Sequence, residues 1–275
     1  DVYKRQLSTS AISIITNKVS QAATEWQNRP LESLYMIVWM DGIVFKVREN
    51  GKVINKTVYL CVGLNKEGLK EVLGMWIGKN ESAAFWMGVL TDLKARGVED
   101  ILITVTDNLN GFTETIKSVF PASTTQICVV HQIRNSCRYV VWKEKKEFTA
   151  DLKNIYNAPT KEAAEMELDN FEQKWGAKYP YAIRSWRNNW EELTVFFDFP
   201  VEIRKIIYTT NLIENLNGKI RKYTKNKLSF PNDDALKKSV YLAINEIEKK
   251  WYQPIWNWAL IFNQFITIFE NRIQV

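Results

Sequence analysis

Cysteine and histidine are scarce in this chain of 275 residues, which contains three cysteines and one histidine. The cysteines are odd in number and follow no repeated spacing, which argues against a disulfide framework and indicates a reducing compartment. A structural zinc site needs four ligands, so Cys128 and His131 cannot form one by themselves. Long apolar runs are also missing, because no stretch approaches the ~18 residues of a membrane span. The most apolar stretch, 255–269, is broken by polar residues and predicts a buried amphipathic helix.

A large excess of one charge is absent as well. The chain has 37 basic and 31 acidic residues, which gives a formal net charge of +6. With 46% hydrophobic and 25% charged residues, the composition is that of an ordinary globular protein and not of a disordered one. The bases are concentrated, however, in a stretch without acids at 217–227: Lys219, Arg221, Lys222, Lys225 and Lys227. Such a run predicts either a surface for a polyanion or a solvated helix face.

The order of the predicted elements indicates a mixed α/β protein. A helical segment ends at Pro30, and apolar patterns rich in β-branched and aromatic residues then predict strands at 34–50, 52–65, 70–78, 100–107 and 125–131. Asn50 and Gly51 predict a tight hairpin between the first two strands. Helices predicted at 81–97 and 111–120 lead into the fourth and fifth strands. An antiparallel hairpin edge therefore continues into parallel strands joined by crossover helices.

Beyond His131 the pattern is helical. We divide the chain into an N-terminal helical linker, the first part of an α/β domain, an all-helical insertion, and the remainder of the α/β domain with C-terminal helices. The corresponding ranges are 1–30, 31–131, 132–205 and 206–275.

Two carboxylates stand out in the predicted sheet. Asp41 interrupts an apolar strand, where a carboxylate without a partner is costly to bury. Its alternative interpretation is an aspartate at a bulge or turn beside Gly42. Asp107 closes the fourth strand, and polar groups at the C-terminal ends of parallel strands line the functional crevice of open α/β sheets. Its alternative is the N-cap of the next helix.

A third carboxylate, Glu214, lies near the start of a helix. The buried stripe of this helix is predicted to contain Ile213, Leu216, Ile220 and Tyr223. Acids at a helix start, here just after Thr209 and Thr210, can simply compensate the helix dipole. However, Glu214 shares one side of the helix with Asn211 and Asn217, and the bases follow. That order suits a divalent ion beside a phosphodiester, because Mg²⁺ takes one or two carboxylates and leaves other positions to water and phosphate.

Several long motifs occur in order between Val19 and Arg272, among them "MDGIVFKVR", "GVEDILITVTDNLNGF", "CVVHQIRNS" and "YTTNLIENLNGKIRKYTK". These motifs resemble the catalytic region of bacterial insertion-sequence transposases of the Mutator superfamily. The resemblance implies an RNase H-like fold whose DDE acids are Asp41, Asp107 and Glu214, interrupted by an all-helical insertion. It also implies metal-dependent cleavage of transposon ends and their transfer into target DNA.

The same resemblance implies the cofactor and the supporting residues. Mg²⁺, with Mn²⁺ as a substitute, is expected as two ions held by the three acids. Cys128 and His131 match a Cys-x-x-His pair of the family, and we interpret His131 as a strand-end residue that orients groups of the active site, with packing and zinc as the alternatives. Asn211 and Asn217 are expected to support the site. The expected DNA-binding residues are Arg134 and the five bases of 217–227.

The chain departs from the family pattern in two places. Asn108 follows Asp107, where the family usually has glycine. The 40 residues before Asp41 are too few for the DNA-binding region that precedes the catalytic domain in this family, so we expect a catalytic region that binds DNA weakly or without sequence preference. The expected partner is double-stranded DNA, with no membrane, a cytoplasmic or nucleoid location, and a homodimer when two ends are paired.

Three other functions remain open at this stage. An RNase H-like nuclease would cut DNA without joining it, and a decayed transposase would keep only a basic DNA-binding surface. A glycosidase would use paired carboxylates and stacked aromatic residues. The tryptophans of this chain, however, fall in helical patterns where packing is the expected use.

Overall fold

A computed structural model describes residues 8–79, 82–107, 111–208 and 211–273. Its centre is a five-stranded sheet with the order β3-β2-β1-β4-β5. The strands are β1 (Leu34–Glu49), β2 (Lys52–Leu64), β3 (Lys70–Gly78), β4 (Asp100–Thr106) and β5 (Thr124–Ile127). β1 pairs with β2 and β2 with β3 in antiparallel fashion, whereas β4 is parallel to both β1 and β5. The predicted mixed α/β sheet, with an antiparallel edge and parallel strands, is confirmed.

The hairpin between β1 and β2 turns at the predicted dipeptide. Asn50 and Gly51 both have positive φ, 49° and 76°, as a two-residue turn of the type favoured in hairpins requires. The ladder closes directly on this turn, with Glu49 paired to Lys52. This fixes the register of β1 and therefore decides which of its side chains face each side of the sheet.

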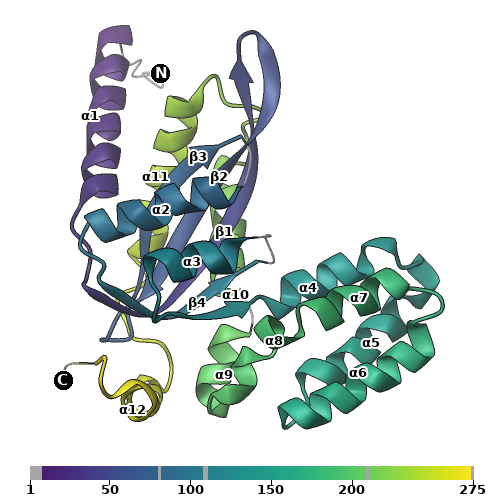
Figure 1. The fold of residues 1–275 in the computed structure, drawn as a ribbon. Coiled ribbons are helices and arrows are strands. Elements are labelled where there is room, and N and C mark those ends of the chain that lie inside the picture. The colour runs from purple at the N-terminus through teal and green to yellow at the C-terminus, as the bar shows by residue number, and fades with distance from the viewer. Residues whose placement is uncertain (1–7, 80–81, 108–110, 209–210, 274–275) are drawn as a thin grey trace, which may run out of the picture.

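Helices cover both faces of the sheet (Figure 1). On one face lie α2 (Ala83–Ala95) and α3 (Phe112–Val119), whose buried side chains form a core with Val38 and Met40 of β1. On the other face lie α10 (Asn211–Thr224) and α11 (Asp233–Glu248), which pack on Ile37 and Trp39 of the same strand. α1 (Thr9–Asn28) runs along α11 and the β3 edge. Successive residues of β1 thus contribute side chains to two hydrophobic cores on opposite faces of the sheet.

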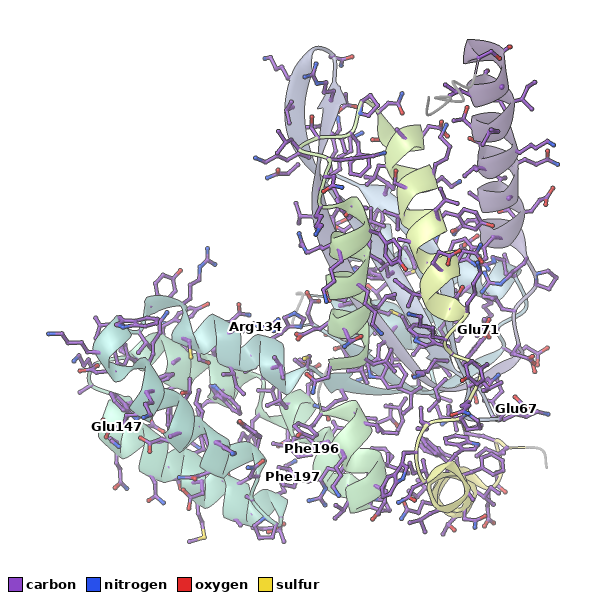
Figure 2. All side chains as sticks on the ribbon, turned by 180° about the vertical axis from the view of Figure 1, so that it is seen from behind. Glu67, Glu71, Arg134, Glu147, Phe196 and Phe197 are labelled. Atoms are coloured by element: carbon purple, nitrogen blue, oxygen red, sulfur yellow. The ribbon has the colours of Figure 1, made fainter. Side chains whose placement is uncertain are left out.

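The segment between β5 and α10 contains only helices in the part that the structure describes. They are α4 (Val129–Ser136), η1 (Cys137–Tyr139), η2 (Trp142–Glu144), α5 (Lys145–Tyr156), α6 (Lys161–Trp175), α7 (Pro180–Asn188), α8 (Trp190–Leu193), η3 (Val195–Asp198) and α9 (Val201–Ile207). Most of them form a lobe beside the sheet (Figure 1). Gln126 of β5 connects this lobe to the sheet, because its buried amide donates to Leu193 O at 2.9 Å and accepts from Phe196 N at 2.7 Å. Phe196 is labelled in Figure 2.

Two predicted elements differ from the structure. The fifth strand was expected to run to His131, but it ends at Ile127, and His131 lies in α4. Cys128 N still donates to Thr106 O of β4 at 2.7 Å, but Val129 N donates to Tyr208 O at 3.1 Å, outside the sheet, and the bond from Gln132 N to Cys128 O at 3.1 Å begins the helix. The prediction of a strand-end histidine was therefore wrong.

The second difference concerns the apolar C-terminal stretch. It forms α12 (Trp258–Phe269), in which Ile261 and Phe265 are buried while Leu260 and Ile268 are 48% and 41% exposed. The helix is amphipathic, but only one stripe of it is buried. Among the described residues, no helix is long and apolar enough to cross a membrane.

Candidate functional site

Asp41 lies in the middle of β1 and is 8% exposed. The β1–β2 ladder continues through it without a break, with Asp41 opposite Leu60 and Gly42 opposite Tyr59, so the bulge-or-turn interpretation is wrong. Its carboxylate accepts two hydrogen bonds of 2.8 Å, from Gly42 N to Oδ1 and from Asn217 Nδ2 to Oδ2. The second bond reaches across from α10, on the face of the sheet that this helix covers.

Asp107 directly follows the last residue of β4. Val38 pairs with Thr104 and Trp39 with Val105, and the same parallel register places Asp107 beside Asp41. Adjacent strands lie about 4.8 Å apart, so the two side chains share one neighbourhood. Burial raises the pKa of the Asp107 carboxyl, His131 opposes this rise, and the charge of Asp41 adds to it. The N-cap of α3 is Gly111, so the alternative of a capping aspartate is wrong.

The Cys-x-x-His pair lies against these two acids. Cys128 is fully buried at the N-terminus of α4, and His131 follows in the first turn of that helix. Burial alone would lower the pKa of His131, but its hydrogen bond to Cys128 and the charges of Cys128, Asp41 and Asp107 raise the pKa to about 9. The imidazole and the two carboxylates therefore favour each other's charged forms. His131 Nδ1 is buried and has no hydrogen-bond partner among the described residues.

Glu214 lies in the first turn of α10, one turn before Asn217. Its carboxylate forms a two-point ion pair with Arg134 of α4, with Nη1–Oε1 at 2.6 Å and Nη2–Oε2 at 2.9 Å. Figure 2 labels Arg134. The side chain of Glu214 is 22% exposed and that of Arg134 is 58% exposed. Thr209 and Thr210, the expected caps of this helix, lie outside the described residues. A favourable interaction of Glu214 with the helix dipole is compatible with this position.

The acids fit a divalent cation in two respects. Asp41 is buried and Asp107, beside it, is half-buried, and two like charges this close together favour a bound cation. In addition, Asn217 Oδ1 is a buried oxygen without a hydrogen-bond partner in the described part of the chain. The carboxylate of Glu214 is paired with Arg134 of α4. Within the described ranges, no three Asp, Glu, His or Cys side chains are arranged as a set of metal ligands.

The remaining predicted residues lie on α10 and just beyond it. Asn211 is exposed and borders a cavity of about 220 Å³ that is also lined by Trp39 and Lys205. Five bases are exposed and form no ion pair within the described residues: Lys219, Arg221, Lys222, Lys225 and Lys227. Lys227 bonds Ser239 Oγ at 3.2 Å and lies over the ring of Phe230 at 5.3 Å, so it also packs on its own chain. In the predicted buried stripe, Tyr223 is 57% exposed and Thr224 is buried in its place.

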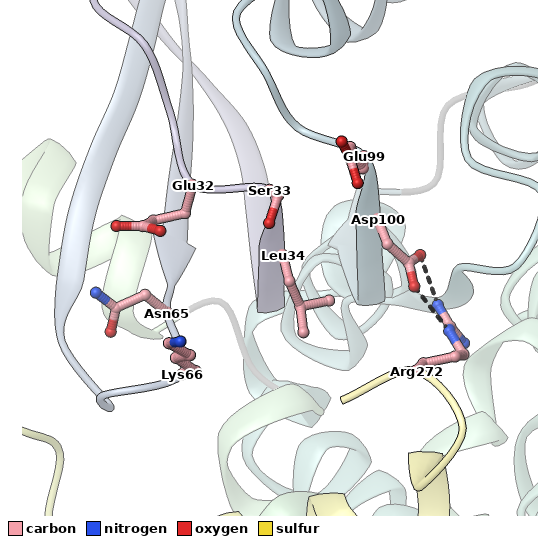
Figure 3. A pocket seen from close by; sticks show the side chains of 8 residues that line it. All are labelled: Glu32, Ser33, Leu34, Asn65, Lys66, Glu99, Asp100 and Arg272. Carbon is pink, nitrogen blue, oxygen red and sulfur yellow. Dashed lines mark hydrogen bonds and ion pairs between the residues drawn. The ribbon is translucent and has the colours of Figure 1, made fainter. Parts of the chain in front are cut away.

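A second cavity, of about 240 Å³, lies at the opposite end of the sheet (Figure 3). Its lining includes Leu34 and Asp100, which begin β1 and β4, whereas Asp41 and Asp107 lie farther along these strands. Asp100 is held by Arg272 through two hydrogen bonds of 2.8 Å. This cavity is therefore separate from the acids.

Sequence reasoning missed one relationship within the site. It assigned Arg134 to DNA and did not foresee the pair with Glu214, from which it is 80 residues distant in the chain. No local pattern could reveal this pair, because it depends on how α4 of the insertion meets α10.

Comparison with known proteins identifies relatives over the whole chain. The model of the family "Transposase, Mutator family" matches residues 1–254. A probable transposase for the insertion sequence element ISRM3-like of Sinorhizobium fredii is 44% identical over 99% of this chain and 68% of its own length. A probable insertion-sequence transposase of Corynebacterium diphtheriae is 40% identical over 89% of this chain and 71% of its own length. The chain thus spans about two thirds of the length of these relatives.

Among solved structures, the Drosophila P element transposase strand transfer complex matches with a TM-score of 0.43 and 9% identity, over 86% of this chain and 85% of that one. A likeness at this level adds nothing to the sequence relationship.

Proposed function

This chain belongs to the Mutator family of transposases, and we propose that Asp41, Asp107 and Glu214 are the residues that carry its chemistry. The observation that supports this proposal most strongly is the hydrogen bond from Asn217 to Asp41. It joins the sheet acids to the helix that carries Glu214. Three acids from β1, the end of β4 and α10 are thereby brought to one side of the sheet.

The reaction proposed for this site is cleavage of a phosphodiester at a transposon end, followed by transfer to target DNA. In the first step a water oxygen attacks phosphorus, and the bond to the 3′-oxygen breaks to leave a 3′-hydroxyl. In the second step this 3′-hydroxyl attacks a phosphodiester of the target and displaces another 3′-oxygen. Divalent ions, Mg²⁺ or Mn²⁺, supply activation of the attacking oxygen and stabilisation of the leaving one when bound.

The side chains of this chain have distinct roles in the proposal. The three carboxylates hold the ions and do not act as proton carriers. Asn217 orients Asp41, and the charged His131 offsets the repulsion between Asp41 and Asp107. The exposed bases of α10 hold the DNA backbone through its phosphates.

Family membership favours transposition over a nuclease that cuts without joining, over a decayed DNA-binding remnant and over a glycosidase. The proposal keeps double-stranded DNA as partner, two copies acting together on two ends, and a cytoplasmic location. It also keeps the division into a linker 1–30, a catalytic domain 31–131 and 206–275, and an insertion 132–205.

The decisive experiment is Glu214→Gln assayed on an oligonucleotide that carries an end of the element. Metal-dependent cleavage should be lost while the melting temperature stays unchanged, because Glu214 is partly exposed and its amide analogue has the same size. Glu165→Gln, at an exposed position of α6, is the matched control and should keep wild-type cleavage. If Glu214→Gln fails to fold, or if it cleaves like the wild type, Glu214 is not a catalytic residue.

A further inference from the structure

The ion pair between Arg134 and Glu214 uses both oxygens of the carboxylate. Nη1 of Arg134 lies 2.6 Å from Oε1, and Nη2 donates to Oε2 at 2.9 Å. A guanidinium bound in this way makes one of the stronger ion pairs available to a side chain. It occupies the oxygens that a metal ion would need.

Glu214 lies on the helix that contacts Asp41, and its carboxylate is paired with Arg134. It lies one turn before Asn217, whose amide is bonded to Asp41, so Glu214 and Asn217 share a face of α10. Arg134 lies three residues after His131 in α4, and His131 faces Asp41 and Asp107. The same helix of the insertion therefore brings His131 to Asp41 and Asp107 and the Arg134 guanidinium to Glu214.

Arg134 is also accessible to a second anion. Its side chain is 58% exposed, whereas that of Glu214 is 22% exposed. A phosphate group offers the guanidinium the same two-point contact as a carboxylate. DNA that lies along the bases of α10 would pass this end of α4, because α4 and α10 meet through the ion pair itself.

We propose that Arg134 is a positioning residue that withholds Glu214 from the metal site until a DNA phosphate takes its place. The inference rests on the proposed function, in which Glu214 is a metal ligand. Arg134 and the metal compete for one carboxylate, while Glu214 and phosphate compete for one guanidinium. DNA and divalent metal consequently strengthen each other's binding, and the coupling must be equal in both directions.

The first test measures Mn²⁺ binding without DNA, by the electron paramagnetic resonance signal of free Mn²⁺. Arg134→Gln frees Glu214 and should raise the affinity for Mn²⁺ about two- to fivefold, the range expected for removal of a partly exposed ion pair. Arg138→Gln is the matched control, because it removes the same charge one turn later at an exposed position over the ring of Tyr139. It should leave the affinity unchanged. Equal effects of both variants, or none in Arg134→Gln, would overturn the inference.

Two further variants separate this inference from the proposed function. Glu214→Gln should lower Mn²⁺ affinity if Glu214 is a ligand, and the double variant Arg134→Gln/Glu214→Gln should show no gain over Glu214→Gln alone. If the double variant binds Mn²⁺ as tightly as Arg134→Gln alone, Glu214 is no ligand even when it is freed from Arg134, and the proposed function fails. If Glu214→Gln lowers binding but Arg134→Gln does not raise it, only the role of Arg134 fails.

The second test adds a short duplex of arbitrary sequence. In the wild type the duplex should raise Mn²⁺ affinity, and in Arg134→Gln this increase should fall several-fold because the guanidinium no longer links the two ligands. Arg138→Gln should keep the wild-type increase. An increase of wild-type size in Arg134→Gln would show that DNA and metal are coupled by another route and would overturn the proposal.

Discussion

Asn217 of α10 donates its side-chain amide to Oδ2 of Asp41 at 2.8 Å, across 176 residues of sequence. The other oxygen of Asp41 accepts from Gly42 N at the same distance. The carboxylate is therefore held on both sides, once by its own strand and once by the helix that carries Glu214. Asn217 Oδ1, buried and without a partner among the described residues, lies at the same place.

Asn217→Ala should weaken the reaction much more than the fold. Residues that orient metal ligands typically contribute about 10- to 100-fold in metal affinity or activity, so cleavage should fall by that amount. The hydrogen bond that this variant removes contributes only about 1 kcal/mol, or roughly 2–4 °C in melting temperature. Asn215→Ala, at an exposed position of the same helix, is the control. Equal losses of activity in both variants would show that Asn217 acts only through the helix.

Asp107→Asn should stabilise the protein while it abolishes cleavage. Because burial, opposed by His131 and reinforced by the charge of Asp41, raises the pKa of Asp107, the ionised carboxylate costs stability in the folded state. An amide removes that cost, and each kcal/mol relieved corresponds to roughly 2–4 °C in melting temperature. Mg²⁺ should raise the melting temperature of the wild type but not of the variant.

The control for Asp107→Asn is Asp198→Asn, at an exposed position of the insertion. It should change neither the melting temperature nor the response to Mg²⁺. If Asp107→Asn keeps wild-type cleavage, Asp107 is no metal ligand and the reaction proceeds without it.

The parts of the fold that could be predicted are those determined by local sequence patterns. The Asn50-Gly51 turn follows from the backbone conformations these residues tolerate, and β1 and β4 follow from continuous apolar runs. Parallel pairing through a crossover helix then brings the residue at the end of β4 near β1. The neighbourhood of Asp41 and Asp107 is thus a consequence of topology, which the element order indicated.

The parts that could not be predicted depend on contacts between distant segments. Val129 and Val130 continue a strand-like pattern, but the hydrogen bond from Val129 N to Tyr208 O turns the chain into a helix and carries His131 with it. The pair of Arg134 with Glu214 likewise requires the insertion to fold back on α10. Neither the start of α4 nor this ion pair can be predicted from the sequence around these residues.

Glu248 gives a pH dependence that is independent of the acids in the site. It lies at the end of α11, where its carboxylate accepts from Val72 N at 2.6 Å. Burial raises its pKa above the ordinary 4.5, against the lowering by this hydrogen bond and by Arg29, and with a further rise from Glu71. Its contribution to stability is therefore fully present below about pH 4.5 and is lost as the pH rises through the folded-state pKa.

Glu248→Gln keeps the acceptor for Val72 N and removes the charge. Its melting temperature relative to the wild type should be lowest in acid and should increase toward neutral pH. Glu246→Gln, whose side chain is 50% exposed and paired with Lys249, should show no such trend. A constant difference between Glu248→Gln and wild type across this range would contradict the argument.

Arg221→Ala and Lys225→Ala test whether the bases on α10 and just beyond it bind DNA or are only solvated. Both side chains are exposed, and neither forms an ion pair among the described residues, so their removal should leave folding intact. If each binds a phosphate, DNA affinity should fall for any sequence, and the slope of log K against log salt should flatten by about 1 for each phosphate that the variant no longer neutralises. The measurement is fluorescence anisotropy of a labelled duplex over a series of salt concentrations.

Lys18→Ala, at an exposed position of α1 along the far edge of the sheet, removes the same charge and should keep the wild-type slope (Figure 1). If all three variants bind like the wild type, the bases of α10 form a solvated helix face and the DNA must follow another path to the acids.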